Sequence, residues 1–218
     1  MKIAVLIPTR GNRPELLENC LRMIRNQTVQ PDHIEVVNDT PLSKERDITL
    51  RYRLGYERLR NKSFDVIFLM EDDDYYSPEY IETMLSAWND AGRPNIFGTS
   101  YTIYYNIGLF AWHPMAHNTR SSAMSTMIAP NLNLTWCVDN DPFTDIHLWR
   151  TVKGKVFTPE KHICLGIKHG TTMTGGKSHV DRLHRYINKD KDHKFLYENM
   201  DIESYNFYSN FMKHYEQK

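Results

Sequence analysis

The sequence predicts an α/β fold: a Rossmann-like, mostly parallel central sheet with flanking helices, plus a small antiparallel element and a helical C-terminal tail. Three short apolar runs, at residues 3–7, 34–37 and 66–70, have the length of strands. They lack polar alternation, which indicates strands buried on both faces. Helical periodicity separates them, and this alternation is typical of a parallel sheet with right-handed crossovers.

Turn residues and apolar spacing place three helices in order. Pro14 is expected in the first turn of a helix, because its fixed φ suits that position. The inward residues of this helix are Leu17, Cys20, Leu21 and Ile24. Ser43 is expected to cap a second, long helix whose inward residues are Leu50, Leu54 and Leu59. Pro78 opens a third helix, whose apolar residues are Ile81, Met84, Leu85 and Trp88.

The pattern changes after the third helix. Residues 96–113 are rich in Tyr, Ile, Thr and Phe around a turn at 106–108, which predicts a hairpin or meander. Asp141 and Pro142 are expected to start a fourth helix, with Asp141 as its cap. The polar residues from 170 onward predict a loop followed by surface helices.

Composition indicates a globular protein with one core. A chain of 218 residues suits a single domain, and its apolar fraction is 40%. Lys plus Arg and Asp plus Glu total 27 each, so no global field draws the chain to nucleic acid or membrane. The sequence contains no run of 18 apolar residues, so it predicts no membrane span.

The N-terminus and the cysteines favour a reducing, cytoplasmic location. The first apolar run is too short for a signal peptide, and Pro8 follows where a small-residue cleavage site is expected. Cys20, Cys137 and Cys164 are too few and too scattered to predict a disulfide framework or a zinc site.

The most informative segment is the run of four carboxylates, Glu71 to Asp74, directly after the third strand. Open α/β sheets bind ligands at the carboxyl ends of their strands. Adjacent carboxylates repel one another unless a cation lies among them, and oxygen ligands at this density suit Mg²⁺ or Mn²⁺ shared with substrate phosphates. The alternative is a solvated acidic turn ahead of a helix, with Ser77 as its cap.

Three groups of residues carry a resemblance to a known family. They are Ile7–Pro14 with Val36–Asp39, Phe68–Pro78, and Thr144–Arg150. Their order and spacing resemble the glycosyltransferases of the A-type fold, especially the large inverting family 2 class. The resemblance covers residues 3–90 well and 139–170 moderately, and it implies a nucleoside-diphosphate-sugar donor.

The resemblance also implies a nucleotide site. Pro8, Thr9 and Arg10 would line the nucleotide pocket, and Asp39 would accept a hydrogen bond from the base, which suits uracil and a UDP-sugar. The family often has two aspartates where this chain has Asn and Asp39, and strand-end polar residues also form turns. Arg53 would contact the nucleotide, although the family's neighbouring Asn is absent and helix arginines are commonly solvated.

Within the acidic run the resemblance assigns separate roles. Asp73 would lie near the ribose and Asp74 would hold the metal through the diphosphate. Asp72 and Asp74 also form a D-x-D pattern, so the ligand assignment is open by one residue. His169, after the last apolar run, would complete the metal shell, and His suits Mn²⁺ better than Mg²⁺.

Inverting transfer needs a base that deprotonates the acceptor hydroxyl. Asp145 is the expected base, because it falls near the start of the fourth helix and stands at one position of the family's Glu-Asp pair. The first position of that pair is Thr144 here. The alternative is that Asp145 only stabilises the helix N-terminus.

The resemblance divides the single domain 1–218 by function. Residues 1–92 would be the nucleotide-sugar-binding half, 93–170 the acceptor and catalytic half, and 171–218 a lid and helical tail. Two other activities stay open. One is a nucleotidyltransferase-like nucleotide-binding enzyme. The other is a glycosyltransferase acting on a modified base in DNA, with the basic and aromatic tail contacting phosphates. The sugar, the acceptor and the oligomeric state cannot be predicted from the sequence.

Overall fold

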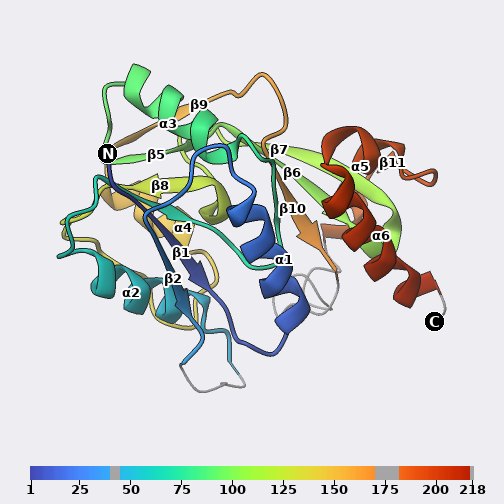
Figure 1. The fold of residues 1–218 in the computed structure, drawn as a ribbon, viewed down its shortest axis with the longest axis horizontal. Coiled ribbons are helices and arrows are strands. Elements are labelled where there is room, and N and C mark those ends of the chain that lie inside the picture. Colours follow the sequence, from blue (N-terminus) through green and yellow to red (C-terminus); the bar gives the residue numbers. More distant parts are fainter. Residues whose placement is uncertain (40–44, 170–181, 217–218) are drawn as a thin grey trace.

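The computed structural model describes residues 1–39, 45–169 and 182–216, with side chains as far as residue 211 (Figure 1). Its central sheet has six strands in the order β2-β1-β3-β8-β5-β9. They are β2 (His33–Val37), β1 (Ile3–Pro8), β3 (Val66–Leu69), β8 (Thr126–Ile128), β5 (Ile96–Thr99) and β9 (Gly154–Phe157). Three of the five strand pairs are parallel, and β8 runs antiparallel to both of its neighbours.

Helices cover both faces of this sheet (Figure 1). Helices α1 (Pro14–Arg25) and α3 (Tyr80–Asp90) share one apolar cluster with Val5 and Phe68. Helices α2 (Ile48–Leu59) and α4 (Thr144–Thr151) share the other with Leu6 and Leu69. Alternate residues of each strand therefore face opposite helical layers, as a doubly covered sheet requires.

Helix α2 approaches the sheet closely at Gly55. A Cβ at that position would lie 2.1 Å from Leu6 Cδ1 and 2.8 Å from Val37 Cγ2. The missing side chain therefore lets α2 pack closely on β1 and β2.

A second, five-stranded sheet adjoins the first. Its strands are β11 (Asn188–Lys189), β7 (Ala111–Ala116), β6 (Tyr101–Asn106), β10 (Cys164–Lys168) and β4 (Tyr75–Tyr76). Figure 1 shows the C-terminal helices α5 (Lys194–Asn199) and α6 (Ile202–Glu216) beside this sheet. Short 3₁₀ helices, η1 (Ile107–Leu109) and η2 (Ala123–Ser125), complete the fold. None of the helices in the described part of the chain has the length and apolar content needed to cross a bilayer.

Most of the predicted elements are confirmed. The first three strands and the helix from Pro14 lie where they were expected. The residues Ile81, Met84, Leu85 and Trp88 are buried on α3 as predicted. Strands β6 and β7 form the predicted hairpin with its turn at η1, whereas the preceding β5 belongs to the central sheet.

Several details of the prediction were wrong. Helix α3 begins at Tyr80, whereas Pro78 lies in the turn before it. Helix α2 begins at Ile48, and its buried apolar residues are Tyr52, Tyr56 and Leu59, whereas Leu50 and Leu54 are only partly buried. Ser43, its expected cap, lies outside the described residues. Helix α4 begins at Thr144 and not at Asp141. Asp141 Oδ1 instead accepts a hydrogen bond from Phe143 N at 2.8 Å, which forms a turn before the helix. The C-terminal helices also contribute to the core, through Leu196 and Tyr208.

Candidate active site

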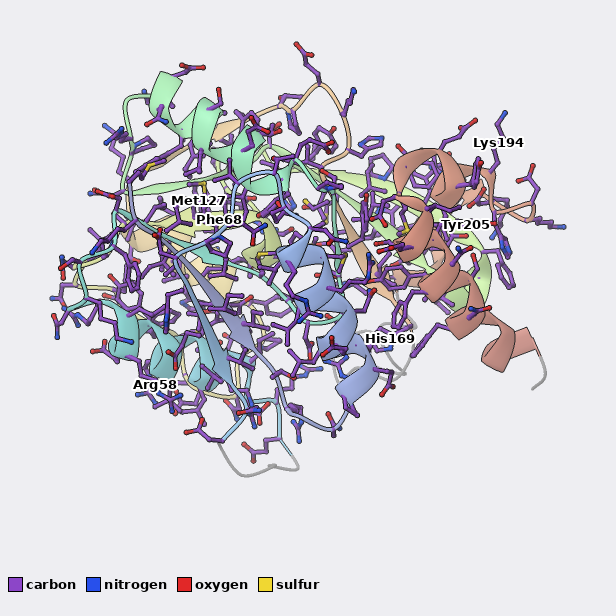
Figure 2. All side chains as sticks on the ribbon, in the orientation of Figure 1. Arg58, Phe68, Met127, His169, Lys194 and Tyr205 are labelled. Carbon is purple, nitrogen blue, oxygen red and sulfur yellow. The ribbon has the colours of Figure 1, made fainter. Side chains whose placement is uncertain are left out.

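The four carboxylates follow the carboxyl end of β3, between the central sheet and the second sheet. Strand β4 follows them and pairs antiparallel with β10, with Tyr75 opposite Leu165. This pairing carries the end of β10 past the carboxylates, so that Lys168 and His169 lie beside them. Figure 2 labels His169. The position of the carboxylates at the end of a strand was predicted from the sequence. The approach of β10 to them was not, because it depends on the tertiary fold.

Asp72 and Asp73 are held by side chains from the loop after β1. Arg13 donates through Nη2 to Asp72 Oδ1 and through Nη1 to Asp73 Oδ2, both at 2.8 Å. Thr9 Oγ1 donates to Asp72 Oδ2 at 2.5 Å. His169 Nε2 lies 3.0 Å from Asp73 Oδ2 and 3.1 Å from Arg13 Nη1. Because these partners come from separate segments, the orientation of both carboxylates is fixed.

Asp74 offers an oxygen suited to a cation. Its side chain is fully buried, and Oδ1 accepts a hydrogen bond from Ile167 N (2.8 Å). Its Oδ2 has no hydrogen-bond partner among the described residues. Such a buried oxygen is costly unless a donor or a metal satisfies it.

Three carboxylates are grouped as metal ligands would be. One oxygen from each of Glu71, Asp73 and Asp74 lies within 4.8 Å of the others. Three carboxylates, one of which has an oxygen without a partner, fit Mg²⁺ or Mn²⁺. Of the predicted ligands Asp72, Asp74 and His169, this group contains Asp74. Asp72 is bonded to Thr9 and Arg13. His169 contacts Asp73 and Arg13.

The pKa values of the cluster reflect burial and mutual repulsion. Burial and the charge of Asp73 raise the pKa of Glu71 to about 7 and that of Asp72 to about 6. Burial also raises the pKa of Asp74 well above its usual range. Burial alone would raise the pKa of Asp73, but the hydrogen bond from His169 and the charge of Arg13 outweigh it and lower that pKa. A bound cation would favour the ionised form of every member.

Lys168 supplies a positive charge inside the cluster. Burial opposes its charge, but the carboxylates of Asp74 and Asp73 outweigh burial and raise its pKa, so the ammonium stays protonated. Its Nζ lies 5.1 Å from the ring centroid of Tyr104, a cation–π distance. Together with Arg13, Lys168 offsets part of the negative charge of the four carboxylates.

A cavity of about 440 Å³ opens beside the cluster, a size typical of small-molecule sites. All four carboxylates of the run line it. The other residues that line it and enter the argument are Pro8, Arg10, Arg13, Tyr104, Arg120, Phe143, Asp145, Lys168, Arg182 and Arg185. The cavity therefore joins the ends of the central strands to the first turn of α4.

Asp145 faces the cavity from α4. It forms an ion pair with Arg120 Nη1, which comes from the segment between β7 and η2, and its side chain is 14% exposed. Burial raises the pKa of Asp145 above its usual value, although the charge of Arg120 opposes the change. A carboxylate that combines cavity access with a raised pKa is suited to accept a proton.

The predicted nucleotide-binding residues divide into two groups. Pro8 and Arg10 line the cavity, and Asp73 lies in the cluster. Thr9 is buried, and its hydroxyl is bonded to Asp72. Its carbonyl accepts a hydrogen bond from the buried Arg51 at 2.7 Å.

Asp39 and Arg53 lie elsewhere. Asp39 is 61% exposed, and its carboxylate accepts a hydrogen bond from Arg58 at 2.9 Å. Arg58 belongs to α2 and is labelled in Figure 2. The hydrogen bond from Arg58 lowers the pKa of Asp39. Arg53 forms an ion pair with Asp139 at 2.9 Å. Neither residue is among those that line the cavity.

Sequence reasoning missed three charged residues of the site. Arg13 stands in the segment that carried the family resemblance, so its sequence signal was present. Lys168 was detectable as the charged residue that ends a buried strand. Arg120 had no signal, because its partner Asp145 is 25 residues further along the chain.

Comparisons with known proteins find one related sequence and solved structures of similar fold. No model of a protein family matches the chain. It is 34% identical over 100 residues to the uncharacterized glycosyltransferase YwdF of Bacillus subtilis strain 168, a match that covers 38% of this chain and 37% of that protein. Two crystal structures of S. aureus TarS 1-349 are also similar. The complex with UDP-GlcNAc has a TM-score of 0.51 at 11% identity and the complex with UDP a TM-score of 0.52 at 12% identity. Each covers 77% of this chain.

The chain therefore has the A-type glycosyltransferase fold, as its sequence predicted. It spans 37% of the length of the YwdF protein and 59–60% of these TarS chains.

Proposed function

We propose that this protein is a metal-dependent glycosyltransferase that transfers a sugar from a nucleoside-diphosphate sugar to an acceptor hydroxyl. One observation carries the proposal. The carboxylate group Glu71, Asp73 and Asp74 and the separate carboxylate Asp145 line the same cavity of about 440 Å³. A sugar transferase needs these two functions, one at the leaving diphosphate and one at the attacking hydroxyl, on facing sides of one site.

We propose a UDP-sugar as the donor. TarS has been crystallised with UDP-GlcNAc and with UDP, and its fold is shared by this chain. The nucleotide would lie at the ends of β1 and β3, against Pro8, Thr9 and Arg10, with its ribose near Asp73. Asp39 and Arg53 are the proposed further contacts, and both would have to exchange their present ion pairs for the ligand.

Glu71, Asp73 and Asp74 are the residues that would hold Mg²⁺ or Mn²⁺, with Asp72 and His169 at the edge of the group. Such an ion neutralises negative charge on the leaving diphosphate as a Lewis acid. Arg13 and Lys168, which lie against the same carboxylates and line the cavity, would add positive charge beside the diphosphate. Preorganised charges of this kind lower the barrier because they are in place before the reaction begins.

Asp145 is the proposed base. It would accept the proton of the acceptor hydroxyl as that oxygen attacks the sugar, opposite the leaving diphosphate. Asp145 lines the same cavity as the metal ligands but comes from a different element, α4, which supports a single displacement and hence inversion at the anomeric carbon. Arg120 would hold the carboxylate in place.

A second candidate acceptor is a modified base in DNA. Arg182 and Arg185, from the basic C-terminal segment, line the cavity and would contact phosphates next to the acceptor. A nucleotidyltransferase-like reaction is the other alternative. We also propose a reducing, cytoplasmic location, because Cys20, Cys137 and Cys164 are all free thiols.

A donor screen tests the proposal. The full chain would be incubated with Mn²⁺ and a panel of nucleotide sugars, with thermal stabilisation and release of nucleoside diphosphate as readouts. We expect a UDP-sugar to stabilise the protein and to yield UDP slowly by hydrolysis. Release of pyrophosphate would instead support a nucleotidyltransferase, and steeply salt-dependent binding to DNA would support the DNA acceptor.

A further inference from the structure

We propose that Cys137, Asp141 and His147 form a Zn²⁺ site, distinct from the acidic cluster and independent of the proposed function. One ligand atom from each residue lies within 4.8 Å of the others. All three side chains are partly buried, so an ion could enter from solvent. Cys137 and Asp141 belong to the segment between β8 and α4, and His147 belongs to α4.

The chemistry of the three ligands favours zinc. A thiolate, an imidazole nitrogen and a carboxylate oxygen together form a ligand set typical of Zn²⁺, whereas Mg²⁺ and Ca²⁺ prefer oxygen alone. Three protein ligands leave a fourth tetrahedral position for water. The sequence analysis predicted no zinc site, because it considered only the number and spacing of the cysteines. The site is apparent in the structure because the fold brings one cysteine close to an aspartate and a histidine.

The carboxylate and the imidazole already have a suitable spacing. Asp141 Oδ2 lies 3.3 Å from His147 Nε2. Two ligand atoms at about 2.0–2.1 Å from a tetrahedral zinc are roughly 3.3 Å apart. An ion could therefore enter between these atoms with little change in their separation.

Neighbouring groups orient Asp141 and contact Cys137. Asp141 Oδ1 accepts a hydrogen bond from Phe143 N at 2.8 Å, which leaves Oδ2 directed to His147. Thr49, a buried residue of α2, donates to the main-chain oxygen of Asp141 at 2.6 Å. Its hydroxyl oxygen also lies 3.4 Å from Cys137 Sγ, which places the thiol beside Asp141. The hydrogen bonds to Asp141 are of the kind that fixes the orientation of a metal ligand.

The fold gives such an ion a structural role. Residues 129–143 contain no helix or strand, and a connection of this length is unusual inside a compact domain. An ion bound by Cys137, Asp141 and His147 would join the end of this segment to α4. Because Asp145 lies between two of these ligands in the sequence, the ion would also stabilise the wall of the cavity that carries it.

Cobalt titration of the metal-free full chain tests the site. Co²⁺ adopts the same tetrahedral geometry and, when a thiolate binds it, shows a near-ultraviolet charge-transfer absorption that carboxylates do not give. We expect this absorption to appear with Co²⁺ and to disappear on addition of Zn²⁺. Cys20 and Cys164 are buried, so the absorption would report Cys137. Absence of the thiolate absorption in the wild-type protein would overturn the proposal.

Matched variants assign the ligands. Cys137→Ser should abolish the thiolate absorption, and His147→Gln should weaken Zn²⁺ binding by roughly tenfold or more. His184→Gln, at an exposed histidine, should leave both measurements unchanged, and Asp74→Asn, in the acidic cluster, should leave the thiolate absorption unchanged. Zn²⁺ should raise the melting temperature of the wild-type protein and not that of folded Cys137→Ser. Unaltered Zn²⁺ affinity in both ligand variants would refute the site, and none of these measurements needs a sugar donor.

Discussion

The two walls of the cavity hold their carboxylates in different ways. On the strand-end wall, Asp72, Asp73 and Asp74 are bonded to groups from the loop after β1 and from β10. On the wall formed by α4, Asp145 has one side-chain partner among the described residues, Arg120. The first wall is therefore an extension of the core, whereas the second depends on a short helix and a single ion pair.

This comparison separates two requirements of the proposed reaction. Metal ligands must stay close together although they repel one another, and only a rigid, multiply bonded frame achieves that. A base has to release one partner and accept a proton during each turnover, so a single exchangeable ion pair suits it. Substitutions that disrupt the first wall should therefore abolish activity. Substitutions on the second wall should lower turnover or change its pH dependence.

The largest expected effect comes from Asp74→Asn. The substitution removes the charge of the fully buried carboxylate whose Oδ2 lacks a partner, so activity should fall to background. The Mn²⁺-dependent stabilisation by UDP should be lost as well, whereas the metal-free protein should be as stable as the wild type or more so, because repulsion decreases. Activity assays and thermal melts with and without Mn²⁺ and UDP measure these effects.

Asp90→Asn, at an exposed residue near the end of α3, is the matched control and should behave as the wild type. Full activity of the wild-type protein in excess EDTA would contradict metal dependence altogether.

The next effect concerns Asp145→Asn, which keeps the size of the side chain and removes its basicity. Turnover should fall by roughly 10²–10⁴-fold with donor binding nearly intact, since a base acts in the transition state. Steady-state kinetics and UDP binding give the two quantities. The anomeric coupling constant of the product, measured by NMR, tests inversion independently.

Retention of configuration would mean that Asp145 is a structural residue. Inversion together with an active Asp145→Asn variant would direct attention to Asp139 or Asp141, which lie just upstream of the same helix.

A smaller effect is expected from Arg120→Gln. Burial raises the pKa of Asp145 and the charge of Arg120 lowers it, so removal of that charge should raise the pKa further. A base must be ionised to act, and the acidic limb of the kcat/KM profile should therefore move to higher pH. Activity well above that limb should change little. Arg120→Lys restores the charge and should return the limb toward its wild-type position, whereas an unmoved limb in Arg120→Gln would dissociate Arg120 from the base.

The same two walls differ in how well the sequence predicted them. The strands and the acidic run depend on local patterns. Each strand was predicted from an apolar run, and the acidic run was found directly after one of them. The grouping of Glu71 with Asp73 and Asp74, and the proximity of Lys168, depend on the pairing of β4 with β10, which no local pattern encodes. Asp145 was predicted through a motif, but its partner Arg120 lies in a segment without periodicity, so only the tertiary fold could identify it.

The smallest expected effect is at Asp39, the proposed uracil contact. Because Asp39 is 61% exposed and paired with Arg58, Asp39→Ala should leave the fold intact. It should weaken UDP binding by up to about tenfold, the range of one hydrogen bond. A base contact is made equally in the ground and transition states, so KM should rise while kcat stays nearly constant.

Glu57→Ala, which removes another exposed ion pair of α2, is the matched control and should leave UDP binding unchanged. Tighter binding of GDP or CMP than of UDP to the wild-type protein would refute the uridine preference. Equal UDP affinity in Asp39→Ala and the wild type would show that the nucleotide is read only by the residues that line the cavity. In that case the strand-end wall alone would select the donor, and Asp39, just after the end of β2, would have no part in donor binding.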